Sequence, residues 1–130
     1  MSIKRKNEDT EFEIRFYEGI LRKKPDFIGV LSALGDLYTR GGQVKKGLEI
    51  DQKLASLRPE DPVVLYNLAC SYSLLDHVDL ALKFIKKAVN YGYDDFTFME
   101  QDTDLANLHN DLRFKRYFKR VKQRSIQPQK

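Results

Sequence analysis

The sequence predicts an all-α fold built from antiparallel helical hairpins, and three observations support this prediction. Residues 62–95 repeat the pattern of residues 28–61 without a gap, apolar side chains fall at helical spacing within each repeat, and the 130 residues include only seven glycines and four prolines. A repeat of this length is typical of architectures in which one hairpin stacks on the next.

The repeat is visible as identities between equivalent positions of the two segments. The eight identical pairs are Val30 and Val64, Leu31 and Leu65, Leu34 and Leu68, Tyr38 and Tyr72, Val44 and Val78, Leu48 and Leu82, Lys53 and Lys87, and Asp61 and Asp95. Two further pairs keep a small residue opposite a small residue, Gly35 with Ala69 and Gly47 with Ala81. Two complete units therefore cover residues 28–61 and 62–95.

Each unit has the pattern of two helices that cross closely. Leu31, Leu34 and Tyr38 are spaced i, i+3, i+7 and form one stripe of a helix. Gly35 lies beside this stripe, and Gly47 lies in the second helix of the same unit. Small residues at both places let the two helices approach as a tight antiparallel hairpin.

These residues resemble the tetratricopeptide repeat (TPR). The first unit matches that pattern at Leu31, Leu34, Gly35, Tyr38, Gly47, Leu54 and Pro59, and the second at Leu65, Leu68, Ala69, Tyr72, Ala81 and Ala88. The units depart from the pattern at Asp51, where a bulky residue is usual, and at Tyr93, which replaces the closing proline. The resemblance implies a short right-handed superhelix, an α-solenoid of about seven helices.

The ends of the chain differ from the complete units. Pro25 precedes Pro59 by one repeat length, so residues 9–27 are expected to form a half unit. Residues 96–124 resemble the degenerate capping unit of small stand-alone bacterial TPR proteins, with Phe114, Phe118 and Val121 facing inward. We therefore expect a single TPR domain over residues 9–124, with disordered tails at 1–8 and 125–130.

The helical spacing and the turn residues set the expected boundaries. Gly41-Gly42 and Asp76-His77 are expected to form the turns within hairpins, and Asp61 is expected to cap a helix with Pro62 at its first position. The helices are expected near residues 9–23, 27–40, 43–57, 61–75, 78–91, 95–100 and 111–123.

The sequence gives no sign of an enzyme, and no cofactor or metal is expected. The nucleotide-binding, hydrolase and zinc-protease motifs are missing. Cys70 has no histidine near it in the expected fold, and His77 and His109 fall in turns. Aspartates 94, 95, 102 and 104 lack the order of a calcium loop and are explained by helix capping.

The chain is expected in the cytoplasm. Its first residues are basic and then acidic, with no apolar segment of the secretory type, and no stretch is apolar enough for a membrane span. Cys70 is the only cysteine, which leaves no partner for an intrachain disulfide.

A protein or peptide partner is expected on the concave face of the repeats. The first helix of each unit has a second stripe that the core does not use, and small polar residues dominate this stripe. Its candidate binding residues are Ser32, Asp36, Val63, Tyr66, Asn67, Cys70 and Gln101. An ordinary solvated helix face is the alternative interpretation.

Some TPR proteins hold a C-terminal carboxylate with Lys, Asn and Arg side chains on this face. Asn67 falls at one of those places, but the matching basic residues do not occur, and Asp36 would repel a carboxylate. We therefore expect an extended or helical peptide of basic or neutral character.

The basic C-terminal segment offers a second candidate surface. Residues 112–130 contain eight basic residues and no acidic residue, and Lys115, Arg116, Lys119 and Arg120 are expected on the outer face of the last helix. They predict contact with nucleic acid or another anionic surface, or with the acidic body of a second copy in a weak homodimer. A solvated basic cap on a monomer is the simpler alternative.

Overall fold

The computed structural model describes residues 3–126, and within this range it contains helices and no strand. Its helices are α1 (Ile3–Lys23), α2 (Ile28–Arg40), α3 (Val44–Leu57), α4 (Pro62–Leu74), α5 (Val78–Asn90), α6 (Phe96–Gln101), the 3-10 helix η1 (Thr103–Leu105), α7 (Ala106–His109) and α8 (Leu112–Ile126). The predicted all-α class is confirmed. Eight α-helices replace the expected seven, because a short helix at residues 106–109 follows the predicted turn in the capping segment.

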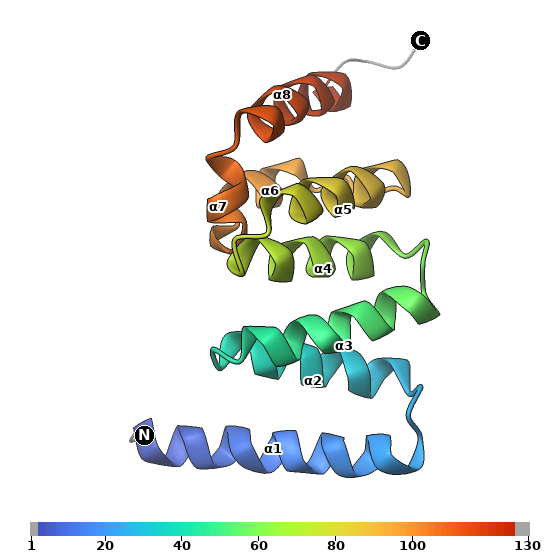
Figure 1. The fold of residues 1–130 in the computed structure, drawn as a ribbon, viewed down its shortest axis with the longest axis vertical. Helices are drawn as coiled ribbons and strands as arrows, with labels where there is room; N and C mark the ends of the chain where they lie inside the picture. Colours follow the sequence, from blue (N-terminus) through green and yellow to red (C-terminus); the bar gives the residue numbers. More distant parts are fainter. Residues whose placement is uncertain (1–2, 127–130) are drawn as a thin grey trace. The chain divides into compact units, whose positions relative to one another are not determined.

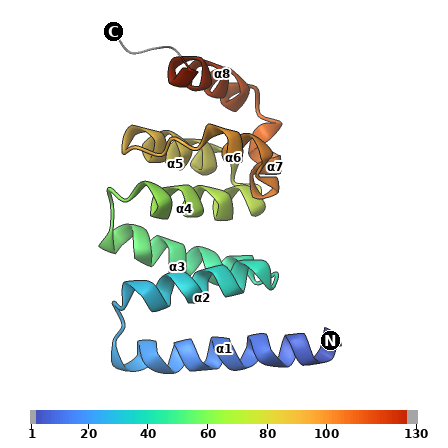
Figure 2. The same ribbon diagram turned by 180° about the vertical axis from the view of Figure 1, so that it is seen from behind.

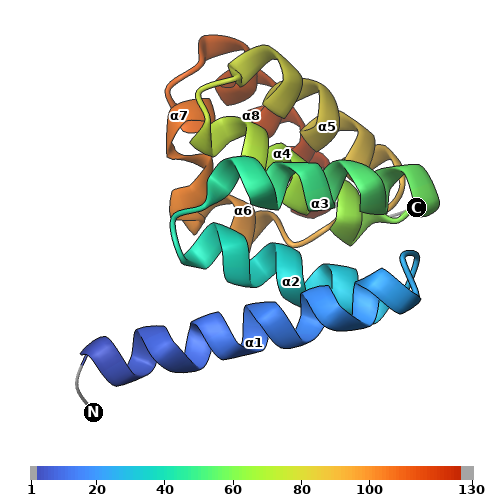
Figure 3. The ribbon, with the colours of Figure 1, turned by 60° about the horizontal axis from the view of Figure 1, so that its bottom comes forward.

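Contacts within the chain cluster in two compact units, one ending at Pro59 and the other beginning at Glu60. In the first unit α2 and α3 form an antiparallel hairpin, and α1 packs along α2 (Figures 1 and 3). In the second unit α4 and α5 form the equivalent hairpin, and η1 and α7 pack against it (Figures 1 and 2).

The first helix begins earlier than expected. Residues 3–8 belong to α1, whereas the sequence predicted a disordered tail over 1–8. No glycine or proline occurs between residues 3 and 18, so nothing in the sequence interrupts the helix there. At the other end α8 continues through residues 125 and 126. Residues 1–2 and 127–130, the rest of the predicted tails, lie outside the described residues.

Close helix crossing explains the small residues of the first hairpin. A Cβ atom added at Gly35 would lie 3.0 Å from Cγ2 of Ile50 and 3.3 Å from Oδ1 of Asp51. One added at Gly47 would overlap the hydroxyl of Thr39. In the second unit Ala81 takes the place that Gly47 has in the first, and it is fully buried.

The turns within the two hairpins share one conformation. Gly42 has φ of +86°, and Asp76, at the equivalent position of the next repeat, has φ of +61°. In both turns the next residue donates a backbone hydrogen bond to the carbonyl of the repeat tyrosine, Tyr38 or Tyr72. The predicted turns are therefore confirmed. The two units also repeat the backbone conformation of the turn, with positive φ at the same position of each.

Helix α4 starts where the sequence predicted. The carboxylate of Asp61 accepts hydrogen bonds from the backbone N–H groups of Val63 and Val64, at 2.9 and 3.2 Å, and Pro62 is the first helical residue. This cap satisfies two of the N–H groups that have no partner within a helix. It fixes the start of the helix that carries most of the candidate site.

Candidate functional site

The predicted concave stripe of α4 is divided between exposed and buried side chains. Val63 is 57% exposed and Asn67 is exposed, as a binding surface requires. Tyr66 and Cys70, expected to line an open groove, are only 3% and 7% exposed. In this structure these two side chains are covered, and they do not reach a partner directly.

The chain itself covers Tyr66 and Cys70. The hydroxyl of Tyr66 donates a hydrogen bond of 2.6 Å to Oδ2 of Asp102, which follows α6. The thiol of Cys70 lies 3.7 Å from the same oxygen. The ring of Tyr66 also stacks on Tyr93, with centroids 4.2 Å apart and planes at 2°. The expected groove is thus filled at this point by the segment from Tyr93 to Asp102.

Burial makes this cluster resistant to ionisation. Desolvation, with the nearby charge of Asp102 adding to it, raises the pKa of the Tyr66 hydroxyl and of the Cys70 thiol well above their ordinary values. Desolvation also raises the pKa of Tyr93 to about 12. The Cys70 thiol is therefore protonated at neutral pH, which is the opposite of what a catalytic cysteine needs.

The covering segment is tied to α4 by polar contacts between parts of the chain that are far apart in sequence. Asp102 caps η1 by accepting from the backbone N–H of Asp104 at 3.0 Å. The side-chain amide of Asn107 donates to the carbonyl of Ser73 at 2.8 Å, and the N–H of Leu108 donates to the Ser73 hydroxyl at 3.3 Å. Ser73, which follows Cys70 by three residues on α4, is fully buried under α7.

An exposed surface remains on α4 and α6, at the edge of the Tyr66 cluster. Phe98 is 51% exposed, and its ring centroid lies 6.1 Å from that of Tyr66. Val63 lies on α4 one turn before Tyr66, and the exposed polar side chains of Asn67 and Gln101 lie on the same two helices. Together Val63, Asn67, Phe98 and Gln101 are called the α4–α6 surface below.

Sequence reasoning did not identify three residues that build this site. Phe98 lies in a short helix that has no equivalent in the preceding repeat, so the repeat pattern did not indicate it. Asp102 was interpreted only as a helix cap, and it does cap η1. The substitution of Tyr93 for the closing proline was the available signal. An aromatic ring at that place can stack on Tyr66. The TPR pattern showed only that Tyr93 differs from the usual proline.

In the first unit the predicted residues lie on α2. Ser32 and Asp36 are both exposed. The Asp36 carboxylate accepts a hydrogen bond of 2.8 Å from Nε of Arg40, one turn later. This exposed pair reduces the local negative charge that the sequence suggested at Asp36.

Helix α8 presents the predicted basic side chains to solvent. Lys115, Arg116, Lys119 and Arg120 are all exposed, and no ion pair joins them to an acidic side chain within residues 8–126. Of the three residues expected to face inward, Phe114 and Val121 are buried, at 3% and 8% exposed, and Phe118 is half-buried against Phe96 and Phe114.

An ion pair joins the start of α8 to α5. Arg113 pairs with Asp79 at 2.6 Å and with Asp111 at 2.8 Å. The hydrogen bond from Arg113 lowers the pKa of the Asp111 carboxyl to about 2. The orientation of the basic face is therefore set by both apolar and charged contacts.

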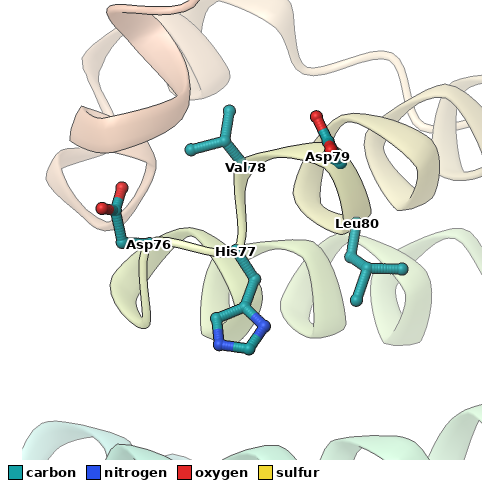
Figure 4. Close-up of a pocket in the computed structure, with 5 residues that line it drawn as sticks. All are labelled: Asp76, His77, Val78, Asp79 and Leu80. Atoms are coloured by element: carbon teal, nitrogen blue, oxygen red, sulfur yellow. The ribbon is translucent and has the colours of Figure 1, made fainter.

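A surface depression of about 520 Å³ lies along the turn between α4 and α5, and Figure 4 shows the residues that line it, Asp76, His77, Val78, Asp79 and Leu80. His77 and Leu80 point to one side of the turn, while Val78 and Asp79 point to the other (Figure 4). The polar groups of this depression do not converge on one point, so it lacks the arrangement of a small-molecule site.

His109, which the sequence placed in a turn, is the last residue of α7. Its Nε2 atom lies 2.9 Å from the carbonyl oxygen of Met99, and its ring packs on Phe114 with centroids 5.5 Å apart. The side chain therefore links α6, α7 and α8.

Within the described part of the chain, no group of three or more His, Cys, Asp or Glu residues is placed to hold a metal ion. No helix among residues 3–126 is both long and apolar enough to cross a bilayer.

The fold is similar to solved TPR structures. The crystal structure of MamA, a TPR protein, aligns with a TM-score of 0.73 and 19% identity over 97% of this chain and 74% of that one. MamA 41-end from Desulfovibrio magneticus RS-1 aligns with a TM-score of 0.67 and 13% identity, over 94% of this chain and 71% of that one. The predicted TPR fold is thereby confirmed.

The comparison of sequences gives a shorter match. Over 80 residues, or 59% of this chain, the sequence is 31% identical to a chloroplastic protein from Arabidopsis thaliana, and the matched segment is 24% of the length of that protein. No family model matches the chain.

Proposed function

We propose that this chain is a non-catalytic protein-interaction module, and that a peptide or protein binds its α4–α6 surface. The TPR fold supports the general class, since its helices present repeated faces rather than a catalytic cleft. The observation that carries the proposal is the half-exposed ring of Phe98 on a rigid base, because Tyr66 beneath it is held by both Tyr93 and Asp102.

The chemistry of this surface favours an apolar anchor with basic or neutral flanks. Val63 and Phe98 offer apolar area, and large apolar side chains on a preorganised base are typical of interface hot spots. Asn67 and Gln101 can hydrogen-bond a peptide backbone. The exposed carboxylate of Asp94 lies four residues before Phe98 and disfavours an acidic ligand, whereas the charge of Glu100 is already paired with Lys122.

The proposal assigns different roles to the residues predicted from the sequence. Val63, Asn67 and Gln101 contact the partner, whereas Tyr66 and Cys70 support the surface from below. In the first unit, the exposed Ser32 and Asp36 remain proposed contacts on α2.

The test begins with peptides selected by display on the purified full chain. Their affinities are then measured for Val63→Asp and Phe98→Ala, and we expect a loss of at least about tenfold for each, as for hot-spot residues. Leu112→Ala is the matched control, because Leu112 is an equally exposed apolar residue, at 59%, on α8. Circular dichroism checks that all three variants remain folded.

Two results decide this test. Selective loss of peptide affinity in the Val63 and Phe98 variants supports the α4–α6 surface. Peptides that bind both variants as tightly as the parent chain would place their site elsewhere, and the proposed surface would then be wrong.

A second candidate function uses the basic face of α8. The four exposed cations Lys115, Arg116, Lys119 and Arg120 suit an anionic surface such as nucleic acid. The buried Phe114 and Val121 leave these side chains pointing outward on a fixed helix. The partner of this surface would be recognised by charge rather than by shape.

Salt dependence tests the second candidate. With a DNA duplex of about 20 base pairs, four phosphate contacts predict that the logarithm of the binding constant falls with a slope of about −3 to −4 against the logarithm of salt concentration. Lys119→Glu with Arg120→Glu should abolish binding, and Lys45→Glu with Arg58→Glu, an equal charge change in the first unit, should have a much smaller effect. No binding by the parent chain at low salt would exclude this function.

A further inference from the structure

Helix α1 has an exposed aromatic face that the first unit does not cover. Phe12 is 64% exposed and Phe16 is 57% exposed, and their rings stack on each other with centroids 6.5 Å apart and planes at 15°. Two large rings side by side in solvent form an apolar patch of the kind that marks an interaction site.

This face is distinct from the face of α1 that packs within the unit. The side that meets α2 carries Ile14, Tyr17 and Leu21, which are partly buried, and Glu18, which accepts a 2.7 Å hydrogen bond from the hydroxyl of Tyr38. With 21 residues against 13, α1 is also longer than α2, and its N-terminal part projects past the end of that helix (Figure 3).

The residues of the exposed face form a stripe that can pair with the same stripe of a second copy. Its members follow the alternating three- and four-residue spacing that keeps side chains on one side of a helix, and they are Asp9, Phe12, Phe16, Gly19 and Lys23. Asp9 and Lys23 are exposed at the two ends of the stripe. The stripe therefore has an acidic end, an aromatic centre and a basic end. When a second copy runs antiparallel to the first, each acidic end faces a basic end.

We infer that this stripe is a homodimerisation surface, on which α1 of a second copy packs antiparallel with Phe16 at the two-fold axis. In that arrangement Asp9 faces Lys23 of the other copy at both ends. The rings of Phe16 from the two copies meet at the centre, where aromatic pairs add to the free energy of apolar burial.

Gly19 provides the space that this packing requires. Reversal of the stripe about Phe16 places Phe12 of one copy within one residue, or about 1.5 Å along the helix axis, of Gly19 of the other. A Cβ atom added at Gly19 would meet only the end of the Arg22 side chain, at 3.5 Å, so this exposed and flexible side chain is the one group that has to move aside. The ring of Phe12 can then fill the space above Gly19 as a knob fills a hole.

The charges exclude the parallel arrangement. Parallel helices would place Asp9 beside Asp9 and Lys23 beside Lys23 of the second copy, and like charges at such close positions repel. One helix face is also much smaller than the roughly 800 Å² per partner of a stable interface, so the expected dissociation constant is on the order of 10 to 100 μM.

Charge exchange tests the pairing directly by sedimentation equilibrium of the full chain. Asp9→Lys alone and Lys23→Asp alone should each be monomeric at concentrations where the parent chain dimerises, because each variant places like charges at both ends of the interface. An equal mixture of the two variants should dimerise again, since both end contacts are then between opposite charges. Glu11→Lys is the control, with the same charge change at an exposed position outside the stripe.

The aromatic centre is tested with Phe16→Glu, which should raise the dissociation constant at least tenfold. Tyr91→Glu, at an exposed aromatic residue of the second unit, should leave dimerisation unchanged. The inference is wrong if the parent chain is monomeric up to 1 mM (about tenfold above the expected range), or if the mixture of charge variants associates no better than either alone. Unchanged peptide affinity in Phe16→Glu would show that dimerisation and the α4–α6 surface are independent.

Discussion

The hydroxyl of Tyr66 donates a 2.6 Å hydrogen bond to the carboxylate of Asp102, which lies 36 residues later in the chain. This contact joins α4 to the segment after α6, and it occurs on the stripe of α4 where exposed binding residues were expected. Both partners lie in the second unit. The contact therefore fixes the shape of the candidate binding surface without help from the first unit.

Removal of the Tyr66 hydroxyl should destabilise the folded chain while leaving its aromatic packing in place. Tyr66→Phe keeps the ring stacked on Tyr93 but leaves the Asp102 carboxylate without this donor. Hydrogen bonds to charged groups contribute about 1.5–3 kcal/mol, so urea unfolding should show a loss of that size. Tyr91→Phe is the matched control, because Tyr91 is an exposed tyrosine.

The loss should depend on Asp102. In a double-mutant cycle, Tyr66→Phe should have a much smaller effect in the Asp102→Ala background, where no side-chain oxygen is left to accept the hydrogen bond. Equal losses in both backgrounds would mean that the hydrogen bond does not contribute to stability.

The Cys70 thiol should react slowly with a disulfide reagent at pH 8, although it is the only cysteine in the chain. Its burial and the adjacent Asp102 charge raise its pKa, and the thiolate is the reactive form. We expect a rate at least about 100-fold below that of the chain in denaturant, because reaction requires local opening of the covering segment.

Asp102→Asn should speed this reaction, since it removes the negative charge beside the thiol and weakens the covering segment. Asp94→Asn makes the same charge change at an exposed position and should leave the rate near that of the parent. A parent thiol that reacts as fast as in denaturant would show that the segment from Tyr93 to Asp102 does not cover Cys70 in solution.

The repeat allowed the hairpins to be predicted in detail. The identities between the two segments indicated the helices of both complete units, the small residues Gly35 and Gly47 at the crossing, and the Asp61 cap. Each of these depends on contacts that are local in sequence or repeated from one unit to the next. Periodicity reports such contacts directly.

The covering of the concave stripe could not be predicted in the same way. It depends on where the capping segment folds back, and that segment has no counterpart in the preceding repeat. Tyr66 illustrates the problem, because its spacing correctly placed it on a second stripe of α4, but only the contact with Asp102 decides whether that stripe is open. The exposed Phe98 was missed for the same reason.

The two turn residues with positive φ should respond in opposite directions to substitution, because one is an aspartate and the other a glycine. Asp76 has φ of +61°, and Gly42 has φ of +86° at the equivalent position of the first hairpin. A residue with a side chain is strained in this region by about 1–2 kcal/mol, although aspartate tolerates it better than most residues. Asp76→Gly should therefore stabilise the chain by about 0.5–1 kcal/mol, and Gly42→Ala should destabilise it by about 1 kcal/mol.

Both effects are conformational rather than steric. A Cβ atom added at Gly42 would meet no atom within 4 Å, so the cost of Gly42→Ala comes from the backbone alone. Thermal unfolding followed by circular dichroism measures both changes. Gly29→Ala is the control at an exposed helical position of α2 with negative φ, where the added Cβ atom would make an ordinary contact of 3.6 Å with the Phe27 ring. Because alanine favours helices over glycine, that variant should be more stable than the parent by up to about 1 kcal/mol. If Gly42→Ala also raised the unfolding temperature, the first turn could not have the left-handed conformation that it shares with the turn at Asp76.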